Sequence, residues 1–155
     1  ADVRVLDGGY SAWVAADGPV ETGSATVVDG DFAARPGMLP RVDASSVASF
    51  AGAVVDARAP ERFRGDVEPI DPAAGHIPGA LNVPTDANLR ADGTFRTPGE
   101  LAALYPEGEI ACYCGSGVTA CHDILALAVA GRSAVLYPGS WSDWVSDPGR
   151  PVATD

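Results

Sequence analysis

A short loop of cysteine and glycine contains the residue types in this sequence that could do chemistry. It reads Cys114-Gly115-Ser116-Gly117-Val118-Thr119 and follows an apolar run that ends at Tyr113. A cysteine between a strand and the first turn of a helix has its sulfur where backbone N–H groups and the positive helix end converge. Such groups stabilise a thiolate or a bound anion. The loop therefore predicts that Cys114 is a nucleophile, with a buried structural thiol as the alternative.

The neighbours of Cys114 in this loop suit one sulfur atom. We expect Gly115 and Gly117 to supply the backbone angles that let the chain curl around it. Ser116 and Thr119 would add hydroxyl donors. A loop that cleaves phosphate esters would need an arginine six residues after the cysteine, and that position is Ala120. Phosphatase chemistry is therefore disfavoured.

The other two cysteines are less suited to chemistry than Cys114. Cys112 lies two residues before Cys114 in the expected strand, so it faces the same side but lies deeper, and we interpret it as a core thiol. Cys121 and His122 follow in the next helix, and their spacing does not form the two separated chelating pairs of a zinc site. A disulfide from Cys114 to Cys121, as in a redox sensor, is awkward in geometry. We expect no metal and no other cofactor.

Composition and charge exclude several classes of protein. The chain has 155 residues, of which 46% are hydrophobic and 20% charged, so one folded domain is expected and disorder is not. The net charge of −11 would repel nucleic acid and anionic lipid. No run of residues is long and apolar enough for a membrane helix. With three cysteines and no disulfide framework, we expect a reducing, cytoplasmic location.

Strands and helices alternate from Arg41 onward, which predicts the α/β class with a parallel sheet. The expected strands are unbroken apolar runs, typical of strands buried on both faces. They lie at 53–57, 80–83, 109–113 and 134–136. Expected helices begin at Asp43, Pro60, Thr97, about Val118 and Trp141, with Thr97 as an N-cap and Pro98 in the first turn.

A short repeat links the two ends of the chain. Residues 8–14 match residues 139–145, and each copy follows a strand-like apolar run and precedes a stop rich in glycine and proline. A repeat spaced by one domain length indicates tandem homologous domains. We therefore interpret the chain as beginning inside a larger protein.

Several motifs, in chain order, resemble the landmarks of the rhodanese sulfurtransferases. The landmarks are Asp56-Ala57-Arg58, Arg62-Phe63-Arg64-Gly65, Gly75-His76-Ile77-Pro78-Gly79-Ala80-Leu81-Asn82, the segment from Cys114 to His122, and Gly139-Ser140-Trp141-Ser142-Asp143-Trp144. The resemblance implies a rhodanese-like fold with a parallel sheet of about five strands and helices on both faces. It also implies that residues 1–20 are the tail of a truncated rhodanese-like domain, 21–40 an interdomain linker and 41–155 the catalytic domain.

The resemblance also implies an activity and a set of residues. Cys114 would take a sulfane sulfur from a small anionic donor, thiosulfate or 3-mercaptopyruvate, hold it as a persulfide, and pass it to cyanide or a thiol. Ser116 would be a second catalytic residue, assisted by the missing N-terminal domain. Substrate-binding residues would be Arg62, Gly115, Gly117, Val118 and Thr119. A second family arginine, nine residues after Arg62, is Asp71 here, and a non-catalytic rhodanese-like binding module remains the alternative.

The remaining polar landmarks are expected to be structural. The resemblance makes His76 part of the scaffold rather than a catalyst. Asp56 and Arg58, at the end of a strand, are expected to brace the following loop. Trp141 and Trp144 are expected to lie in the core and to cover the cysteine loop.

Overall fold

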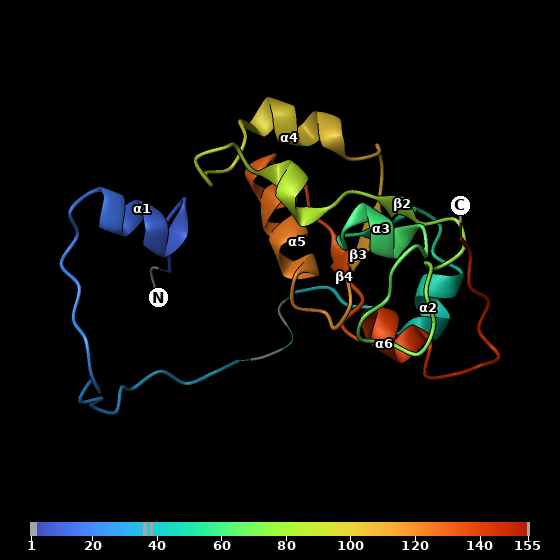
Figure 1. Cartoon of the computed structure of the whole chain (residues 1–155), viewed down its shortest axis with the longest axis horizontal. Helices are drawn as coiled ribbons and strands as arrows, with labels where there is room; N and C mark the ends of the chain where they lie inside the picture. Colours follow the sequence, from blue (N-terminus) through green and yellow to red (C-terminus); the bar gives the residue numbers. More distant parts are fainter. Residues whose placement is uncertain (1–2, 36, 38, 155) are drawn as a thin grey trace.

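Four short parallel strands form the centre of this computed structural model, which describes residues 3–35, 37 and 39–154. They are β1 (Ala53–Asp56), β2 (Leu81–Asn82), β3 (Ile110–Tyr113) and β4 (Val135–Leu136), in the order β2-β1-β3-β4 (Figure 1). The sequence predicts about five strands. In the fifth position Arg41 makes only a single bridge to Leu136, because Pro40 lacks an N–H group and Asp43 already caps the next helix.

Both faces of the sheet are buried, as its apolar strands predict. Along β3, Ile110 and Cys112 belong to one core cluster, and Ala111 and Tyr113 belong to the other. This alternation follows from the period of two in a strand. Cys114 belongs to the same cluster as Cys112, so the two thiols lie on one face, as expected.

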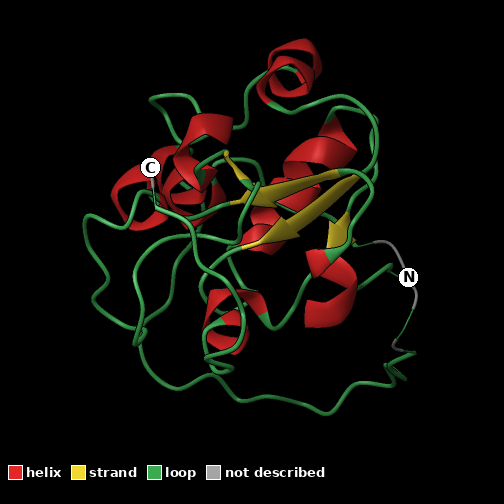
Figure 2. Ribbon diagram, turned by 90° about the vertical axis from the view of Figure 1, so that its right-hand side faces the viewer, coloured by secondary structure: helices red, strands yellow, loops and turns green. Residues whose placement is uncertain are grey.

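Helices cover the two faces in separate groups, which confirms the predicted α/β class (Figure 2). Residues of the first group pack in the core with Tyr113, and those of the second pack with Cys112. The first group is α2 (Ala44–Ala48), α3 (Pro60–Phe63) and α6 (Ser140–Trp144). The second is α4 (Pro98–Leu104) and α5 (Ala120–Val129), with the 3₁₀ turn η1 (Thr85–Asn88) in contact with both.

Two predicted helix starts are confirmed by their caps. The carboxylate of Asp43 accepts a hydrogen bond from the N–H group of Ser46. Thr97 and Glu100 form a reciprocal capping box at the start of α4. The helix after the cysteine loop begins at Ala120 rather than near Val118, so the loop is two residues longer than expected.

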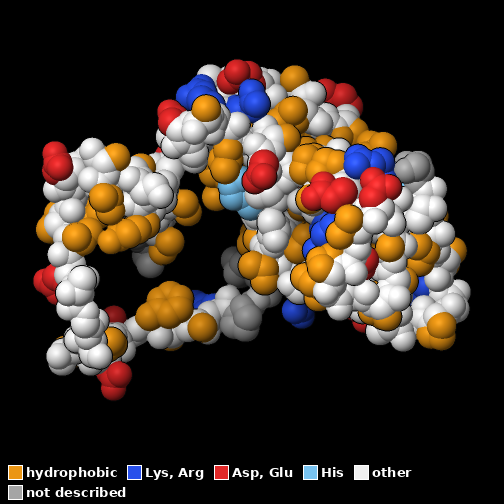
Figure 3. Space-filling view, viewed as in Figure 1, with side chains coloured by type: hydrophobic (Ala, Val, Ile, Leu, Met, Phe, Trp, Pro, Cys, Tyr) orange, Lys and Arg blue, Asp and Glu red, His pale blue; other side chains and the backbone are white. Residues whose placement is uncertain are grey.

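Before Arg41, the described residues form one helix, α1 (Gly9–Ala15), at the place that the repeat predicts. The apolar run at 3–6 forms no strand, and the described residues of 21–40 form neither helix nor strand. The side chain of Trp13 in α1 is 41% exposed, whereas its counterpart Trp144 is 2% exposed. Figure 1 shows α1 apart from the sheet, and Figure 3 shows hydrophobic side chains on the surface there. Among the described residues, no helix has the length and apolar character needed to cross a bilayer.

A buried carboxyl group lies between α4, η1 and α5. Asn88 donates a hydrogen bond of 2.8 Å to Oδ1 of Asp123 and accepts one of 2.7 Å from the hydroxyl of Tyr105. Asp123 is fully buried, and its Oδ2 has no hydrogen-bond partner among the described residues. Burial raises the pKa of Asp123 to about 7, against the lowering effect of the hydrogen bond from Asn88 and of the nearby hydroxyl of Tyr105.

Replacing Asp123 with asparagine is expected to change how stability depends on pH. The pKa of this carboxyl is higher in the folded chain, about 7, than its ordinary value of 3.8. Its stabilising effect is therefore fully present below about pH 4 and is lost as the pH rises to about 7. Over that interval the free energy of unfolding of Asp123→Asn should rise by up to about 4 kcal/mol relative to that of the original chain. Urea unfolding of both proteins measures this difference, and a difference that does not vary with pH would contradict it.

Candidate active site

A cavity of about 490 Å³ opens at the carboxyl end of the sheet. In parallel sheets this edge is where ligands bind. Its lining comes from the loops after β1, β2 and β3, from α3, and from Ser142 of α6. The lining includes the charged residues Arg58, Arg62, Asp71 and Asp86 and, from the loop after Cys114, Gly115, Ser116 and Thr119.

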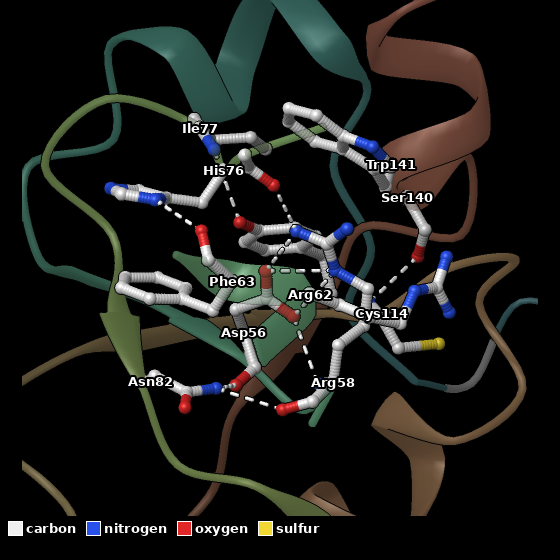
Figure 4. Close-up of polar contacts among 12 residues, drawn as sticks. Asp56, Arg58, Arg62, Phe63, His76, Ile77, Asn82, Cys114, Ser140 and Trp141 are labelled. Carbon is white, nitrogen blue, oxygen red and sulfur yellow. Dashed lines mark hydrogen bonds and ion pairs between the residues drawn. The ribbon is translucent and has the colours of Figure 1, made fainter. Parts of the chain in front are cut away.

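Cys114 is held by its backbone next to this cavity. Its N–H group donates a hydrogen bond of 3.0 Å to Oγ of Ser140, and its carbonyl accepts one of 2.9 Å from the N–H group of Trp141. The carbonyl of Gly115 accepts another from Ser142. Cys114 is 1% exposed, and Figure 4 shows its sulfur beside the guanidinium group of Arg62. Three bonds to one helix therefore fix the position of the thiol.

The loop after Cys114 leaves its backbone donors unused. Among the described residues, no N–H group from Gly115 to Thr119 donates a hydrogen bond to another protein atom. The loop then leads into α5, a helix of 10 residues that begins at Ala120. Free N–H groups and the positive end of a helix both attract negative charge. The arrangement can therefore stabilise a thiolate or an anion at this edge.

The two glycines of the loop, Gly115 and Gly117, have different structural roles. Gly117 has φ +80°, and a Cβ there would lie 2.3 Å from the carbonyl oxygen of Pro138. Only glycine fits this position without a shift of the backbone. Gly115 has no positive φ, and a Cβ there would lie 3.5 Å from Nη1 of Arg62, an ordinary contact. Our expectation of an unusual backbone angle is therefore wrong for Gly115, where glycine instead leaves room beside Arg62.

The structure brings four of the expected site residues together on the cavity wall: Arg62, Gly115, Ser116 and Thr119. The side chains of Ser116 and Thr119 are exposed. The other two expected contacts, Gly117 and Val118, do not line the cavity. Val118 is 74% exposed.

Carboxylates hold the guanidinium group of Arg62. Its Nη2 lies 2.6 Å from Oε1 of Glu68 and 3.5 Å from Oδ2 of Asp71, and its Nε donates to Glu68 at 3.2 Å. Burial raises the pKa of Glu68, but hydrogen bonds from Arg62 and from the N–H groups of Asp71 and Ile70 outweigh burial and lower it. Arg62 thus enters the cavity as a partly neutralised cation.

The loop after β1 is braced by a buried ion pair, which confirms the predicted role of Asp56 and Arg58. The guanidinium group of Arg58 binds both oxygens of Asp56, at 2.7 to 3.1 Å, and donates to the carbonyl of Gly75. It also lies 4.6 Å from the ring of Trp141. Asn82 donates to the carbonyls of Asp56 and Arg58 (Figure 4). This cluster joins β1, β2 and α6 under the cavity.

Replacing Arg58 with alanine is expected to destabilise the fold by about 3–5 kcal/mol, because it leaves the buried carboxylate of Asp56 without its partner. The exposed pair of Arg64 and Asp66 offers a matched control. There Arg64→Ala should change the free energy of unfolding by less than about 1 kcal/mol. Urea unfolding of the two variants checks the prediction, and equal losses in both would contradict it.

Ser140 has a role that the sequence did not predict. It is fully buried with φ 55°, a left-handed backbone that costs a non-glycine residue about 1–2 kcal/mol. Its hydroxyl donates to the carbonyl of Tyr137 and accepts from the N–H group of Cys114. The only signal in the sequence was its place in the motif that contains Trp141.

The remaining candidate residues, His76, Cys112 and Cys121, do not line the cavity. His76 is buried, stacks on Phe63 and is hydrogen-bonded through Nδ1 to its carbonyl, as a scaffold residue would be. Cys112 is fully buried, and burial with the nearby charge of Asp123 raises the pKa of its thiol. The thiol of Cys121 is exposed and donates to the carbonyl of Gly117.

Comparisons with known proteins identify the family of this chain. The family described as the rhodanese-like domain matches residues 42–147. SseB of Mycobacterium tuberculosis, named for a thiosulfate sulfurtransferase activity, is 48% identical over 98% of this chain. The 3-mercaptopyruvate sulfurtransferase of Escherichia coli is 36% identical over 97% of it. This chain spans 57% and 58% of the lengths of these two relatives.

A solved structure supports the same assignment. It is a variant of EanB in complex with ergothioneine covalently linked to a cysteine persulfide, and it is 25% identical to this chain. The two superpose with a TM-score of 0.82 over 99% of this chain and 41% of the other. The chain therefore belongs to the rhodanese-like domain family.

Proposed function

We propose that this chain is a sulfurtransferase that moves a sulfane sulfur from thiosulfate or 3-mercaptopyruvate, through a persulfide on Cys114, to cyanide or a thiol. The observation that carries the proposal is a thiol fixed by Ser140 and Trp141 at the start of a loop with unused N–H groups. The names of the two sequence relatives support sulfur transfer. The persulfide in the EanB complex supports a covalent intermediate on cysteine.

The exchange has two balanced steps. In the first, the thiolate of Cys114 attacks the sulfane sulfur of thiosulfate, a new S–S bond forms, and sulfite leaves with the electron pair of the broken S–S bond. With 3-mercaptopyruvate a C–S bond breaks instead, and the carbon that keeps the electron pair takes up a proton. In the second step cyanide or a thiolate attacks the outer sulfur, and the pair returns to Cys114 as a thiolate.

Each expected residue has a role in these steps. The N–H groups of the loop, from Gly115 to Thr119, stabilise the negative charge on the sulfur atoms. Nη1 of Arg62, which has no bond to a carboxylate among the described residues, binds the anionic group of the donor. The hydroxyl of Ser116 is a further donor on the cavity wall. No step needs a metal or another cofactor.

The proposal extends to the organisation of the parent protein. Residues 1–20 would be the end of a preceding rhodanese-like domain, 21–40 a linker and 41–155 the catalytic domain, acting in the cytoplasm. The exposed Trp13 in α1, whose counterpart Trp144 is buried, supports a missing neighbour for α1.

Steady-state kinetics with thiosulfate and cyanide test the proposed function. A two-step exchange through Cys114 should give parallel lines in double-reciprocal plots, because sulfite leaves before cyanide reacts. Intersecting lines would require both substrates on the protein at once and would overturn the persulfide step. Absence of turnover with either donor would favour the alternative of a non-catalytic binding module.

A further inference from the structure

The charged side chains around the cavity are less suited to binding an anion than the N–H groups of the loop are. Two of its lining residues are arginines, and two are aspartates. The guanidinium group of Arg58 is buried, and its bonds to Asp56, Glu68 and the carbonyl of Gly75 occupy it. It therefore offers no positive charge to a molecule in the cavity.

Arg62 is also partly neutralised. Its side chain is 17% exposed, and it lies against two carboxylates, Glu68 at 2.6 Å and Asp71 at 3.5 Å. Glu68 is ionised at neutral pH, because hydrogen bonds lower its pKa. It also accepts a bond from the N–H group of Asp71, which fixes the turn that carries Asp71 beside Arg62.

The cavity therefore carries an excess of negative charge. Asp86, in η1, is exposed on the cavity wall and has no ion-pair partner among the described residues. The charged groups in or directly behind the wall are the carboxylates of Asp56, Glu68, Asp71 and Asp86 and the guanidinium groups of Arg58 and Arg62. Four negative charges against two positive ones leave two in excess, which favours a cation in the cavity.

We propose that Asp71, assisted by Asp86, makes this cavity selective for a sulfur acceptor that carries an ammonium group, that is, an amino thiol. The inference rests on the proposed function, because the acceptor reacts in its second step. The acceptor thiolate attacks the outer sulfur of the Cys114 persulfide, a new S–S bond forms, and the bond to Cys114 breaks. The electron pair returns to Cys114, the proton stays on the outer sulfur, and no oxidant is needed.

Three small thiols that differ in charge provide the first test: cysteamine, 2-mercaptoethanol and 3-mercaptopropionate. Each is reacted with persulfide-loaded protein, with and without Asp71→Asn. Differences in thiol pKa cancel when each variant is compared with the original chain for the same thiol. We expect Asp71→Asn to lower the rate constant for cysteamine about tenfold and to raise the rate constant for 3-mercaptopropionate about tenfold. The rate constant for 2-mercaptoethanol should not change. Asp86→Asn should act in the same directions, less strongly.

A matched control separates the cavity charge from the net charge of the protein. Glu107 is exposed and follows α4, near the amino end of β3 and therefore at the opposite edge of the sheet from the cavity. Glu107→Gln removes the same charge, and we expect it to leave the ratio of the cysteamine and mercaptopropionate rates unchanged. Equal losses for all three thiols in Asp71→Asn would indicate structural damage and would overturn the proposal, as would no change in any of them.

A second measurement does not depend on sulfur transfer. In a Cys121→Ser background, Cys114 is modified with a cationic and with an anionic methanethiosulfonate reagent. The original Asp71 should favour the cationic reagent, and Asp71→Asn should reduce that preference about tenfold. If this preference is present but Cys114 takes no sulfur from a donor, the proposed function fails and the charge selectivity stands. If sulfur transfer works and the preference does not respond to Asp71, the selectivity is wrong.

Discussion

Cys114→Ser is expected to reduce turnover of thiosulfate and cyanide to the uncatalysed rate, a loss of at least about a thousandfold. A serine hydroxyl is far less acidic than a thiol, so the loop N–H groups cannot make it a nucleophile at neutral pH. Serine is close to cysteine in size, and the backbone bonds of Cys114 to Ser140 and Trp141 remain. Formation of thiocyanate, followed in a steady-state assay, measures the loss.

The exposed thiol of Cys121 supplies the control for this variant. Cys121→Ser removes a thiol seven residues along the chain and leaves the proposed nucleophile in place. It should keep turnover within about twofold of the original chain, as expected for a surface substitution away from the reacting atoms. Turnover that survives in Cys114→Ser but is lost in Cys121→Ser would mean that Cys121, and not Cys114, is the nucleophile.

Gly117→Ala is expected to lower turnover about a hundredfold, because the loop must move to admit the new Cβ. That atom would lie 2.3 Å from the carbonyl oxygen of Pro138, and the backbone at this position has φ +80°. A shift of the loop moves its N–H groups relative to the sulfur of Cys114. The same steady-state assay measures the effect, with urea unfolding to follow stability.

Gly93 provides a control with the same backbone angle. It also has φ +80°, but a Cβ there would meet no atom within 4 Å. Gly93→Ala should therefore cost about 1–2 kcal/mol of stability, as a left-handed backbone does, and leave turnover unchanged. Similar turnover in Gly117→Ala and the original chain would contradict the role of the loop shape.

Local patterns in the sequence were sufficient to predict much of the fold. The apolar run that ends at Tyr113 predicts a strand, and Thr97 as an N-cap with Pro98 in the first turn predicts the start of a helix; both are present. The expected strand at 3–6 is absent, and the described part of that run is exposed. Apolar residues form a strand only where a neighbouring strand and a core receive them.

The parts of the site that could not be predicted depend on contacts between distant residues. Ser140 reaches the N–H group of Cys114 across 26 positions of the chain. The buried bond between Asn88 and Asp123 spans 35 positions. Glu68 and Arg62, which form an ion pair, are closer in sequence, but their contact depends on the path of an irregular loop. No helical or strand period encodes such pairs, so the charge of the cavity emerges only from the folded chain.

Peptide mapping of the protein after reaction with thiosulfate tests the central claim most directly. The donor is removed and thiols and persulfides are alkylated. Because Cys112, Cys114 and Cys121 lie close together in the sequence, the peptides are fragmented by tandem mass spectrometry to assign any additional sulfur to one cysteine. We predict one additional sulfur atom on Cys114, and none on Cys112 or Cys121. An additional sulfur on Cys121, or turnover with no sulfur retained on Cys114, would contradict it.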